Sequence, residues 1–365
     1  MTVEGKKVLV VGIARSGVAA AQLLASRGAT VIANDVKPES ELREAASELR
    51  KLDVMLSLGG HPKSLFENAD LIVLSPGVPA DLPQLEAARR AGIEIISEPE
   101  LAGRFLRGRM IGVTGSNGKT TVTALIGELM RAAGAQVIVG GNIGTPLTSL
   151  IDKSTDETWT VAELSSFQLE MIDTLRVNVA VVTNITPDHL DRHGSFDNYV
   201  KAKHRIFLNQ TGEDWAVLNG QDHGVTEMTT ELGIESRKIY FSSRRRETLT
   251  GAQADVFALG GSVYTTMLAD CAGEVEVIGL DEIPLPGMHN VENVMTALGA
   301  TFCAMGTRER DLPALREAVK RFTGVEHRLE YVAEVDGIKF YNDSKATNVD
   351  STMKALEAFE RNIIV

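Results

Sequence analysis

The segment RMIGVTGSNGKTT, residues 109–121, decides how the centre of this chain folds. Its first half is a short run of apolar and β-branched residues, which predicts a strand at 110–114. A glycine-rich turn follows directly, and the residues after it have the apolar spacing of an amphipathic helix. Backbone N–H groups of such a turn point outward at the positive end of the helix dipole, where an anion is stabilised. The segment therefore predicts a phosphate-binding loop between a strand and a helix.

The chemistry of this loop depends on two side chains. Lys119 is suited to the β- and γ-phosphates of a nucleotide, and the Thr120 hydroxyl can hold a magnesium ion. A strict Walker A pattern needs glycine at position 113, where this chain has Val113, so the loop is a shortened variant. An ordinary Gly-Lys turn at the start of a helix is the alternative interpretation. The residues predicted to surround the phosphates are Gly115, Ser116, Asn117, Gly118, Lys119, Thr120 and Thr121.

A second glycine turn lies near the N-terminus. Residues 6–12 predict a strand that ends in glycine, and residues 18–27 predict a helix. The turn Gly12–Gly17 resembles a dinucleotide-binding fingerprint in which Ala14 replaces the middle glycine, and Asp35 ends the next strand. Because Ala14 leaves less room for a pyrophosphate, another nucleotide is favoured over a nicotinamide cofactor. A tight turn without any ligand explains this motif equally well.

Strands alternate with helical segments on both sides of residue 105. Further apolar runs predict strands at 30–33, 70–74 and 94–96, and then at 136–139, 158–163 and 177–183. Such alternation is typical of parallel βαβ units. The predicted class is α/β, with a Rossmann-like N-terminal domain, a central ATP-binding domain of the P-loop type and the start of a third α/β domain. The predicted domain ranges are 1–105, 106–324 and 325–365.

The last part of the chain predicts a hinge and a few short elements. Residues 324–328 predict the hinge, and residues 329–335 and 338–341 predict a hairpin around an Asp-Gly pair. Residues 352–359 predict a helix. The run 363–365 predicts the start of a buried strand, so we expect a third domain that is cut short.

Carboxylate, imidazole and amine side chains follow the phosphate loop. Glu163 ends a predicted strand, where α/β nucleotide enzymes place a metal-binding carboxylate, and a buried or capping glutamate is the alternative. Residues 184–193 contain enough carboxylates and imidazoles for a metal or substrate site, although a helix-capping loop is equally consistent. Lys203 lies in a predicted helix with Lys201 and Arg205, and these residues alone predict a solvated basic face.

The composition argues against several classes of partner. The 365 residues include 37 Lys and Arg against 49 Asp and Glu, and the net charge of -12 argues against nucleic-acid binding. The 2 cysteines are too few for a disulfide framework, and the N-terminal residues have no secretion-signal pattern. No apolar run approaches the roughly 18 residues of a membrane span. We therefore expect a cytoplasmic protein with neither a nucleic-acid nor a membrane partner.

Several motifs together resemble the Mur ligases, and the resemblance covers essentially the whole chain. Its carriers are residues 115–121, 141–144, 163–168, 188–192, 287–290 with Asn293, 327–328 and 342–348. The last stretch, NDSKATN, is the most specific, because relatives that add other amino acids carry different residues there. The resemblance is greatest to the members that join D-glutamate to UDP-N-acetylmuramoyl-L-alanine. It implies a monomeric, ATP-dependent ligase of bacterial peptidoglycan precursor synthesis that acts through an acyl phosphate and a tetrahedral intermediate.

The resemblance also implies roles for individual residues. ATP would be held by the loop 115–121 together with Asn293, Arg328 and Asp343, the last two from across the hinge. The implied catalytic residues are Lys119, Glu163, His189 and Lys203. Two Mg²⁺ ions are implied, with the ligands Thr120, Glu163, His189 and a carbamylated Lys203. The implied substrate-binding residues are Arg15, Ser16, Asp35 and Gly77 at the uridine diphosphate, Asn142 at the muramoyl group, and Lys345 and Thr347 at D-glutamate.

The chain departs from the family pattern at two places, and three alternatives follow. Val36 and Lys37 stand where the family offers a hydroxyl and an arginine to the uracil end. The third domain of the family normally continues with a sheet that supplies a lysine and a serine to D-glutamate. A catalytically incomplete form that binds the UDP-sugar and ATP is therefore one alternative, and a ligase similar to folylpolyglutamate synthase is another. A nicotinamide dehydrogenase would leave Lys119, Glu163 and residues 342–348 unexplained and is ranked last.

Overall fold

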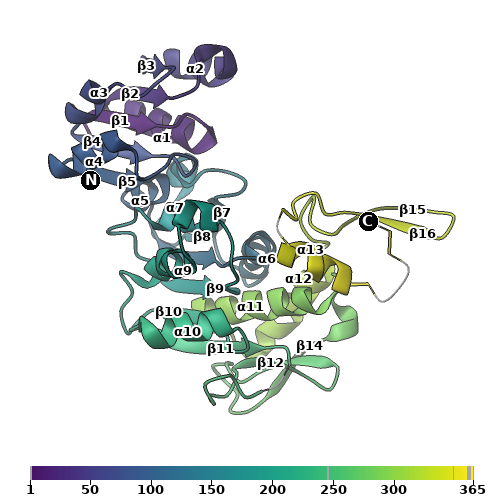
Figure 1. The fold of residues 1–365 in the computed structure, drawn as a ribbon. Coiled ribbons are helices and arrows are strands. Elements are labelled where there is room, and N and C mark those ends of the chain that lie inside the picture. Colours follow the sequence, from purple (N-terminus) through teal and green to yellow (C-terminus); the bar gives the residue numbers. More distant parts are fainter. Residues whose placement is uncertain (1, 245, 348, 360–362, 365) are drawn as a thin grey trace. The chain divides into compact units, whose positions relative to one another are not determined.

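The computed structural model describes residues 2–244, 246–347, 349–359 and 363–364. The chain forms two compact units (Figure 1). Unit 1 comprises Met1–Gly108, Gly140–Glu157 and Leu164–Arg176, and unit 2 comprises Arg109–Val139, Thr158–Glu163 and Val177–Val365. Within the described ranges, no helix has the length and apolar character that a membrane crossing requires.

Unit 1 is built on a five-stranded sheet with the order β3-β2-β1-β4-β5. All four strand pairs are parallel, as the sequence predicts. Its strands are β1 (Lys7–Val11), β2 (Thr30–Asp35), β3 (Met55–Leu58), β4 (Leu71–Leu74) and β5 (Glu94–Ser97). Because β1 pairs with both β2 and β4, the strand order reverses there, and α/β sheets bind ligands at the carboxyl ends of strands at such a point.

Helices cover both faces of this sheet. Along β1, Val8 and Val10 belong to a core that includes Leu24, whereas Leu9 belongs to a second core that includes Phe66. A strand whose alternate residues are all buried is typical of a sheet with helices on both faces. The helical elements of unit 1 are α1 (Arg15–Ser26), η1 (Glu39–Glu41), α2 (Arg43–Arg50), α3 (Lys63–Glu67), α4 (Pro83–Arg90), α5 (Glu98–Gly103), η2 (Leu147–Lys153) and α7 (Ser166–Leu169).

Two buried carboxylates of α5 bind the later segments that belong to unit 1. Glu98 Oε1 accepts hydrogen bonds from the N–H and the hydroxyl of Thr148, at 2.7 and 2.8 Å. Glu100 accepts hydrogen bonds from the backbone of residues 173–175 and pairs with Arg104. Unit 1 thus includes two segments that lie beyond residue 105 in the sequence. The ranges 1–105, 106–324 and 325–365 remain predictions, because compact units group segments and do not mark where domains end.

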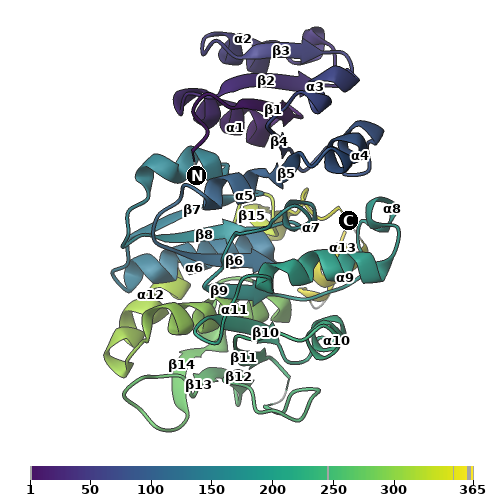
Figure 2. The same ribbon diagram turned by 90° about the vertical axis from the view of Figure 1, so that its left-hand side faces the viewer.

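Unit 2 contains a nine-stranded sheet with the order β14-β13-β12-β11-β10-β9-β6-β8-β7 (Figure 2). The pairs from β8 through β6, β9, β10 and β11 to β12 are parallel, as expected for βαβ units. The pairs β12–β13 and β13–β14 are antiparallel, and this edge was not predicted. The strands are β6 (Arg109–Thr114), β7 (Val137–Gly141), β8 (Trp159–Glu163), β9 (Val179–Val182), β10 (Trp215–Asn219), β11 (Arg237–Ser242), β12 (Val256–Leu259), β13 (Ser262–Thr265) and β14 (Val275–Gly279).

The helices of unit 2 pack around an apolar core. Leu125 and Ile126 of α6 and Leu298 of α11 belong to one buried cluster with Ile111 and Val181 of the sheet. Both helices therefore lie against each other and against the central strands. The helical elements are α6 (Lys119–Ala132), α8 (Leu190–His193), α9 (Phe196–His204), η3 (Arg205–Phe207), α10 (His223–Glu231), η4 (Leu280–Glu282), α11 (Met288–Met305), η5 (Glu309–Asp311), α12 (Leu312–Arg321) and α13 (Val349–Glu357).

The hairpin predicted near the C-terminus is confirmed. Strands β15 (Glu330–Val335) and β16 (Ile338–Asn342) pair antiparallel. The connecting Asp336 and Gly337 have φ values of 50° and 78°, as two-residue hairpin turns require. The predicted helix is α13. Ile363 and Ile364 lie outside regular secondary structure, so the strand predicted there is wrong for these two residues, and Val365 lies outside the described residues.

Candidate functional site

The predicted phosphate loop joins β6 to α6. Gly115 and Gly118 have φ values of 142° and 84°, in the region that other residues rarely adopt. A Cβ atom on Gly115 would collide with the Thr183 hydroxyl, and one on Gly118 would collide with Asn293 Oδ1. Both glycines therefore serve the backbone conformation and a close approach to side chains from other elements.

The segment after β9 holds the first half of the loop. The Asn184 carbonyl accepts a hydrogen bond from Ser116 N at 2.9 Å. The Ser116 hydroxyl donates to the Thr186 carbonyl at 2.9 Å and lies 2.8 Å from the Tyr199 hydroxyl. Ser116 therefore positions the loop through both its side chain and its N–H group. The N–H groups of the first turn of α6, residues 119–121, have no partner within the helix and are the ones suited to an anion.

The Lys119 side chain folds back and hydrogen-bonds to the loop. Its Nζ donates to the carbonyl oxygens of Gly115 and Ser116 at 2.9 and 2.7 Å. Burial lowers the pKa of Lys119, and the charge of Glu163 counteracts this shift. A cation placed inside a glycine loop in this way is the expected partner of a polyphosphate.

Glu163 lies beside the loop at the end of β8. It pairs in register with Val113 of β6, and its residue is 1% exposed. Its charge reaches both Lys119 and Lys203, because it opposes the lowering of both pKa values. The structure thus brings a buried carboxylate to the same end of the sheet as the loop. A metal-binding role for Glu163 requires this position.

Lys203 is not part of a solvated basic face, so that interpretation of the sequence is wrong. Its residue is 2% exposed, whereas Lys201 on the same helix is exposed. Its Nζ donates to the Gly115 carbonyl at 2.7 Å and lies 4.5 Å from the centre of the Tyr199 ring. Burial, followed by the charge of Lys119, lowers the pKa of Lys203 well below its ordinary value. The side chain therefore tends toward the neutral amine.

Residues 188–193 form a turn and a short helix close to these lysines. His189 is the N-cap of α8 and has a φ of 51°. Asp188 Oδ1 accepts a hydrogen bond from His189 N at 3.0 Å, and the Asp188 charge opposes the lowering of the pKa of both Lys119 and Lys203. His189 has a half-exposed side chain, 3.7 Å from Asp188. The segment starts a helix, and Asp188 lies within electrostatic range of the buried lysines, while the metal or substrate site stays a prediction.

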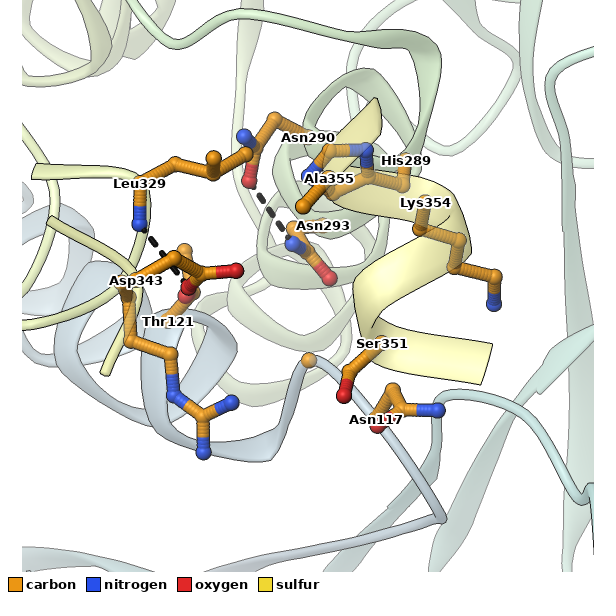
Figure 3. A pocket seen from close by; sticks show the side chains of 12 residues that line it. Asn117, Thr121, His289, Asn290, Asn293, Leu329, Asp343, Ser351, Lys354 and Ala355 are labelled. Atoms are coloured by element: carbon orange, nitrogen blue, oxygen red, sulfur yellow. Dashed lines mark hydrogen bonds between the residues drawn. The ribbon is translucent and has the colours of Figure 1, made fainter. Parts of the chain in front are cut away.

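A pocket of unit 2 opens beside the phosphate loop (Figure 3). Six residues predicted to hold ATP line it: Asn117, Gly118, Thr121, Asn293, Arg328 and Asp343. Six further lining residues were not predicted: His289, Asn290, Leu329, Ser351, Lys354 and Ala355. The first two belong to the GMHN stretch that carries the family resemblance, so that motif could have identified them. The last three share one face of α13 by their spacing.

Hydrogen bonds fix the orientation of the amides in this pocket. Asn290 Nδ2 donates to the Pro286 carbonyl at 2.7 Å, so Asn290 Oδ1 accepts from Asn293 Nδ2 at 3.0 Å. Asn293 therefore directs its Oδ1 toward Gly118, where it can accept a hydrogen bond from a ligand. Burial lowers the pKa of His289 to about 4, so its imidazole is neutral at pH 7.

The segment after the hinge completes the pocket. Asp343 Oδ1 accepts a hydrogen bond from Leu329 N at 3.1 Å, and burial raises the pKa of Asp343 despite the charge of Arg328. Lys345 N donates to the His327 carbonyl at 3.3 Å, and Thr347 is exposed. Asn348, the last residue of the NDSKATN stretch, lies outside the described residues.

The glycine turn of unit 1 is packed more tightly than its motif suggests. A Cβ atom on Gly17 would collide with the Gly12 carbonyl oxygen, which also accepts a hydrogen bond from the Ser75 hydroxyl at 2.7 Å. Asp35 Oδ2 accepts a hydrogen bond from Ile13 N at 2.9 Å. The glycines are therefore needed for the fold of the turn whether or not a ligand binds.

The predicted substrate residues of unit 1 lie around this turn or follow a strand. Arg15 and Ser16 begin α1, Asp35 ends β2, and Gly77 follows β4. The first and last of these are exposed, as is Asn142, which follows β7. Since carboxyl ends of parallel strands share one edge of a sheet, Asp35 and Gly77 lie at the same edge as the turn.

His61 lies at this edge too and was not among the predicted residues. The Asn34 amide donates to the carbonyls of Ser57 and Gly60, both at 2.7 Å, so its Oδ1 is the acceptor that faces His61 Nδ1 at 2.6 Å. Nδ1 therefore carries a proton. The Gly-Gly-His segment directly after β3 was the available signal.

Comparison with known proteins decides the family. Residues 113–301 match the Mur ligase middle domain, and residues 6–97 match the N-terminal domain described as Mur ligase MurD-like. The chain belongs to the Mur ligase family. A relative from Acidobacterium capsulatum, named UDP-N-acetylmuramoylalanine–D-glutamate ligase, is 47% identical over 363 residues, which are 100% of this chain and 76% of the relative. Relatives of the same name from Koribacter versatilis and Clostridioides difficile are 46% and 40% identical and are covered to 77% and 78%.

Solved structures of other Mur ligases share the fold of this one. The UDP-N-acetylmuramate-alanine ligase of Thermotoga maritima matches 97% of this chain with a TM-score of 0.56 at 22% identity, and 77% of that structure is covered. The pseudomurein peptide ligase type C of Methanothermus fervidus matches 98% with a TM-score of 0.54 at 22% identity, with 78% covered. The predicted α/β class, with Rossmann-like and central ATP-binding domains, is confirmed.

Mur ligases depend on ATP and Mg²⁺, and the residues around the loop of this Mur ligase fit such an ion. Thr120 Oγ1 is buried and has no hydrogen-bond partner among the described residues, as suits a hydroxyl that a cation would engage. In the described part of the chain, no group of three or more His, Cys, Asp and Glu side chains is arranged around one metal position. Magnesium usually keeps waters and substrate phosphates as ligands, so a hydroxyl and one carboxylate are an appropriate contribution from the protein.

Proposed function

We propose that this Mur ligase joins D-glutamate to UDP-N-acetylmuramoyl-L-alanine at the expense of ATP, in cytoplasmic peptidoglycan precursor synthesis. The observation that carries the proposal is that Lys119 and Lys203 both donate to the Gly115 carbonyl within electrostatic range of Glu163, beside a pocket lined by Asn293 and Asp343. The names of the relatives from Acidobacterium capsulatum and Koribacter versatilis support D-glutamate as the amino acid added.

The nucleotide would lie along the pocket and the loop. Asn293 Oδ1 would accept a hydrogen bond from the base, and Asp343 and Arg328 would hold the ribose and the adjoining phosphate. Lys119 and the first N–H groups of α6 would neutralise the terminal phosphates. A magnesium ion held by Thr120 and Glu163 would supply Lewis acidity at the phosphates.

The reaction would have two steps. The carboxylate of the acceptor would attack the γ-phosphorus, forming a C–O–P linkage as the bond to the β-phosphate oxygen breaks and ADP leaves. The amine of D-glutamate would then attack the acyl carbon, release phosphate and lose a proton. In this chain, Lys119 offsets the repulsion between the two anions of the first step, and the burial of the loop residues limits access of water to the acyl phosphate.

Lys203 would serve as a carbamate. A carbamate forms when a neutral amine attacks carbon dioxide and loses a proton, which converts a cation into an acidic oxygen ligand. Burial and the neighbouring Lys119 favour the neutral amine that this reaction needs. The carbamate and His189 would then hold a second magnesium ion, as the family resemblance implies.

The acceptor would bind through unit 1. Arg15 and Ser16 at the start of α1 would hold the diphosphate, Asp35 and Gly77 would face the uridine, and Asn142 would contact the muramoyl group. D-Glutamate would lie near Lys345 and Thr347. We propose that the protein acts as a monomer.

Product analysis tests this proposal. The chain is incubated with ATP, Mg²⁺ and UDP-N-acetylmuramoyl-L-alanine, and either D-glutamate, L-glutamate or no amino acid is added. We expect phosphate release that requires D-glutamate, together with a product heavier than the acceptor by one glutamyl residue in mass spectrometry. No release, with the UDP-sugar and ADP still bound in titrations, would mean that this chain binds both ligands without ligating them. Release with L-glutamate in preference would contradict the proposed substrate.

A further inference from the structure

Helix α13 forms one wall of the nucleotide pocket. Its residues Ser351, Lys354 and Ala355 line the pocket, and their spacing of three and four places them on one helical face (Figure 3). Lys354 also lines the adjoining cavity together with Thr183, Glu292 and Thr296. The pocket therefore has this wall only while α13 rests against the rest of unit 2.

The residue after α13 packs closely against the start of α11. Gly287, the N-cap of α11, has a φ of 89°, and a Cβ atom there would lie 2.8 Å from the Cβ of Ala358, which follows α13. Such a distance is shorter than ordinary contacts allow, so the two backbones approach as closely as they do because this position is glycine.

Two carboxylates on elements near α13 are held by hydrogen bonds of their own. Glu292 belongs to α11, and its Oε1 accepts a hydrogen bond from the Ser243 hydroxyl at 2.5 Å. Asp222 is the N-cap of α10, and its Oδ1 accepts hydrogen bonds from Val225 N and Ile185 N at 2.8 and 3.1 Å. Both carboxylates are thus anchored to elements other than α13.

The charge of Lys354 shifts the pKa values of two neighbouring groups. It lowers the pKa of Asp222, which burial and the charge of Glu292 raise, and it adds to the lowering of the pKa of His289. The ammonium group of Lys354 therefore lies within electrostatic range of Asp222 and lines the same cavity as Glu292, whose charge repels that of Asp222. The attraction acts in a half-buried place, where solvent screens it less than at an exposed surface.

We propose that Lys354 is a positioning residue whose attraction to Asp222 and Glu292 holds α13 against α11 and so sets the affinity of the pocket for an adenine nucleotide. The part that concerns the nucleotide rests on the proposed function. Loss of the Lys354 charge removes a cation that offsets the repulsion between the two carboxylates, and this weakens the packing of α13 against α11. The same release would move residues 343–347, which precede α13 and carry the proposed ribose and D-glutamate contacts.

Two measurements on the full chain test the proposal. Hydrogen exchange of the α13 amides without nucleotide reports its docking, and titration with ADP reports the pocket. Lys354→Glu should accelerate exchange in α13 about tenfold and weaken ADP about tenfold or more, as expected for a partly buried pair that is turned into a repulsion. The matched control is Lys339→Glu, on the exposed strand β16, which should change neither value.

A charge swap separates a specific attraction from general damage. The double variant Lys354→Glu with Glu292→Lys should restore exchange and ADP affinity to within about threefold of the native chain, because the attraction is re-formed with its sign reversed. Lys354→Gln, which keeps the length of the side chain, should give an intermediate loss. Single variants that behave like the native chain, or a swap that restores neither property, would overturn the proposal.

The outcomes also separate this inference from the proposed function. If the native chain bound no ADP while the swap still restored exchange in α13, the docking would stand and the assignment of the nucleotide pocket would fail. If ADP bound the native chain and Lys354→Glu equally and α13 exchanged at the native rate, the inference would fail and the proposed function would stand.

Discussion

The two units of this Mur ligase contain the same backbone device, a glycine turn between a parallel strand and a helix, in different surroundings. In unit 1 the turn Gly12–Gly17 leads into α1, whose first residue, Arg15, is exposed. In unit 2 the loop encloses Lys119, and a second buried amine, that of Lys203, donates to the same Gly115 carbonyl. The backbone alone offers an anion site in both places.

The chemistry available at such a turn depends on the side chains that the fold buries beside it. Around the unit 2 loop, burial lowers the pKa of both Lys119 and Lys203, and the charge of Glu163 opposes both shifts. Around the unit 1 turn, Asp35 is used to hold Ile13 N, and the described hydrogen bonds serve the fold of the turn. We therefore propose that the first turn binds the UDP-sugar and that the second holds the reacting phosphates.

The largest expected effect comes from the loop lysine. Lys119→Ala should reduce D-glutamate-dependent phosphate release about 10³-fold, because a preorganised cation at developing charge contributes about that much. Affinity for the UDP-sugar should stay the same in a direct titration. The exposed Lys201→Ala is the control and should retain activity. If Lys119→Ala lowered the affinity for ATP and for the UDP-sugar equally, the two turns would not serve separate sites.

Substitutions of Lys203 test the second buried amine of the unit 2 loop. Lys203→Ala should reduce turnover about 10²-fold, because a proposed metal ligand is lost. High bicarbonate should partly restore it, since a small oxygen anion can occupy the space of the carbamate. Lys203→Arg should stay inactive at any bicarbonate concentration, because a guanidinium group does not lose its proton. Activity that is indifferent to both the substitution and bicarbonate would remove Lys203 from the site.

A stability measurement probes the turn of unit 1. Gly17→Ala should lower the free energy of unfolding by about 3 kcal/mol or more, because its Cβ atom would collide with the Gly12 carbonyl oxygen. Gly60→Ala, where a Cβ atom meets nothing within 4 Å, is the matched control and should change little. Urea denaturation gives both values. Similar stabilities for the two variants would contradict the structural role of Gly17.

A pH titration examines the buried carboxylate of unit 1. Burial raises the pKa of Glu98 from 4.5 to about 7, so the folded chain holds this proton more tightly than the unfolded chain. The associated stability is fully present below about pH 4.5 and is lost as the pH rises through 7, by up to about 3 kcal/mol. Glu98→Gln, which has no proton to lose, should flatten this slope in urea denaturation at several pH values, while the exposed Glu44→Gln should not. An unchanged slope in Glu98→Gln would contradict the assignment.

The sequence predicted the strand–loop–helix around residues 109–121 and the parallel arrangement of both sheets, because hydrophobic periodicity and glycine position encode local structure directly. It did not predict the antiparallel edge β12–β14, since antiparallel and parallel strands have similar short apolar runs. The local pattern also placed Lys203 on a solvated face, whereas the family resemblance implied a metal ligand. Which side of α9 is buried depends on its packing against the loop at Gly115, 88 residues away, and no local pattern records that contact.

The pocket shows the same limit. Six of the ten residues that the resemblance assigned to ATP line it, but the sequence did not predict Ser351, Lys354 and Ala355, because their place depends on how α13 packs. The buried carboxylates Glu98 and Glu100 were missed for the same reason, because their partners at residues 148 and 173–175 lie far along the chain.

If the unit 1 turn binds the UDP-sugar and the unit 2 loop binds the adenine nucleotide, paired titrations will show it. ADP and UDP-N-acetylmuramoyl-L-alanine are each titrated into the native chain, Lys119→Ala and Arg15→Ala. Lys119→Ala should weaken ADP alone, and Arg15→Ala should weaken the UDP-sugar alone by about tenfold, as loss of one charge-assisted hydrogen bond implies. Equal loss of affinity for both ligands in either variant would contradict separate sites. So would a Lys119→Ala variant that weakened only UDP-sugar binding, or an Arg15→Ala variant that weakened only ADP binding.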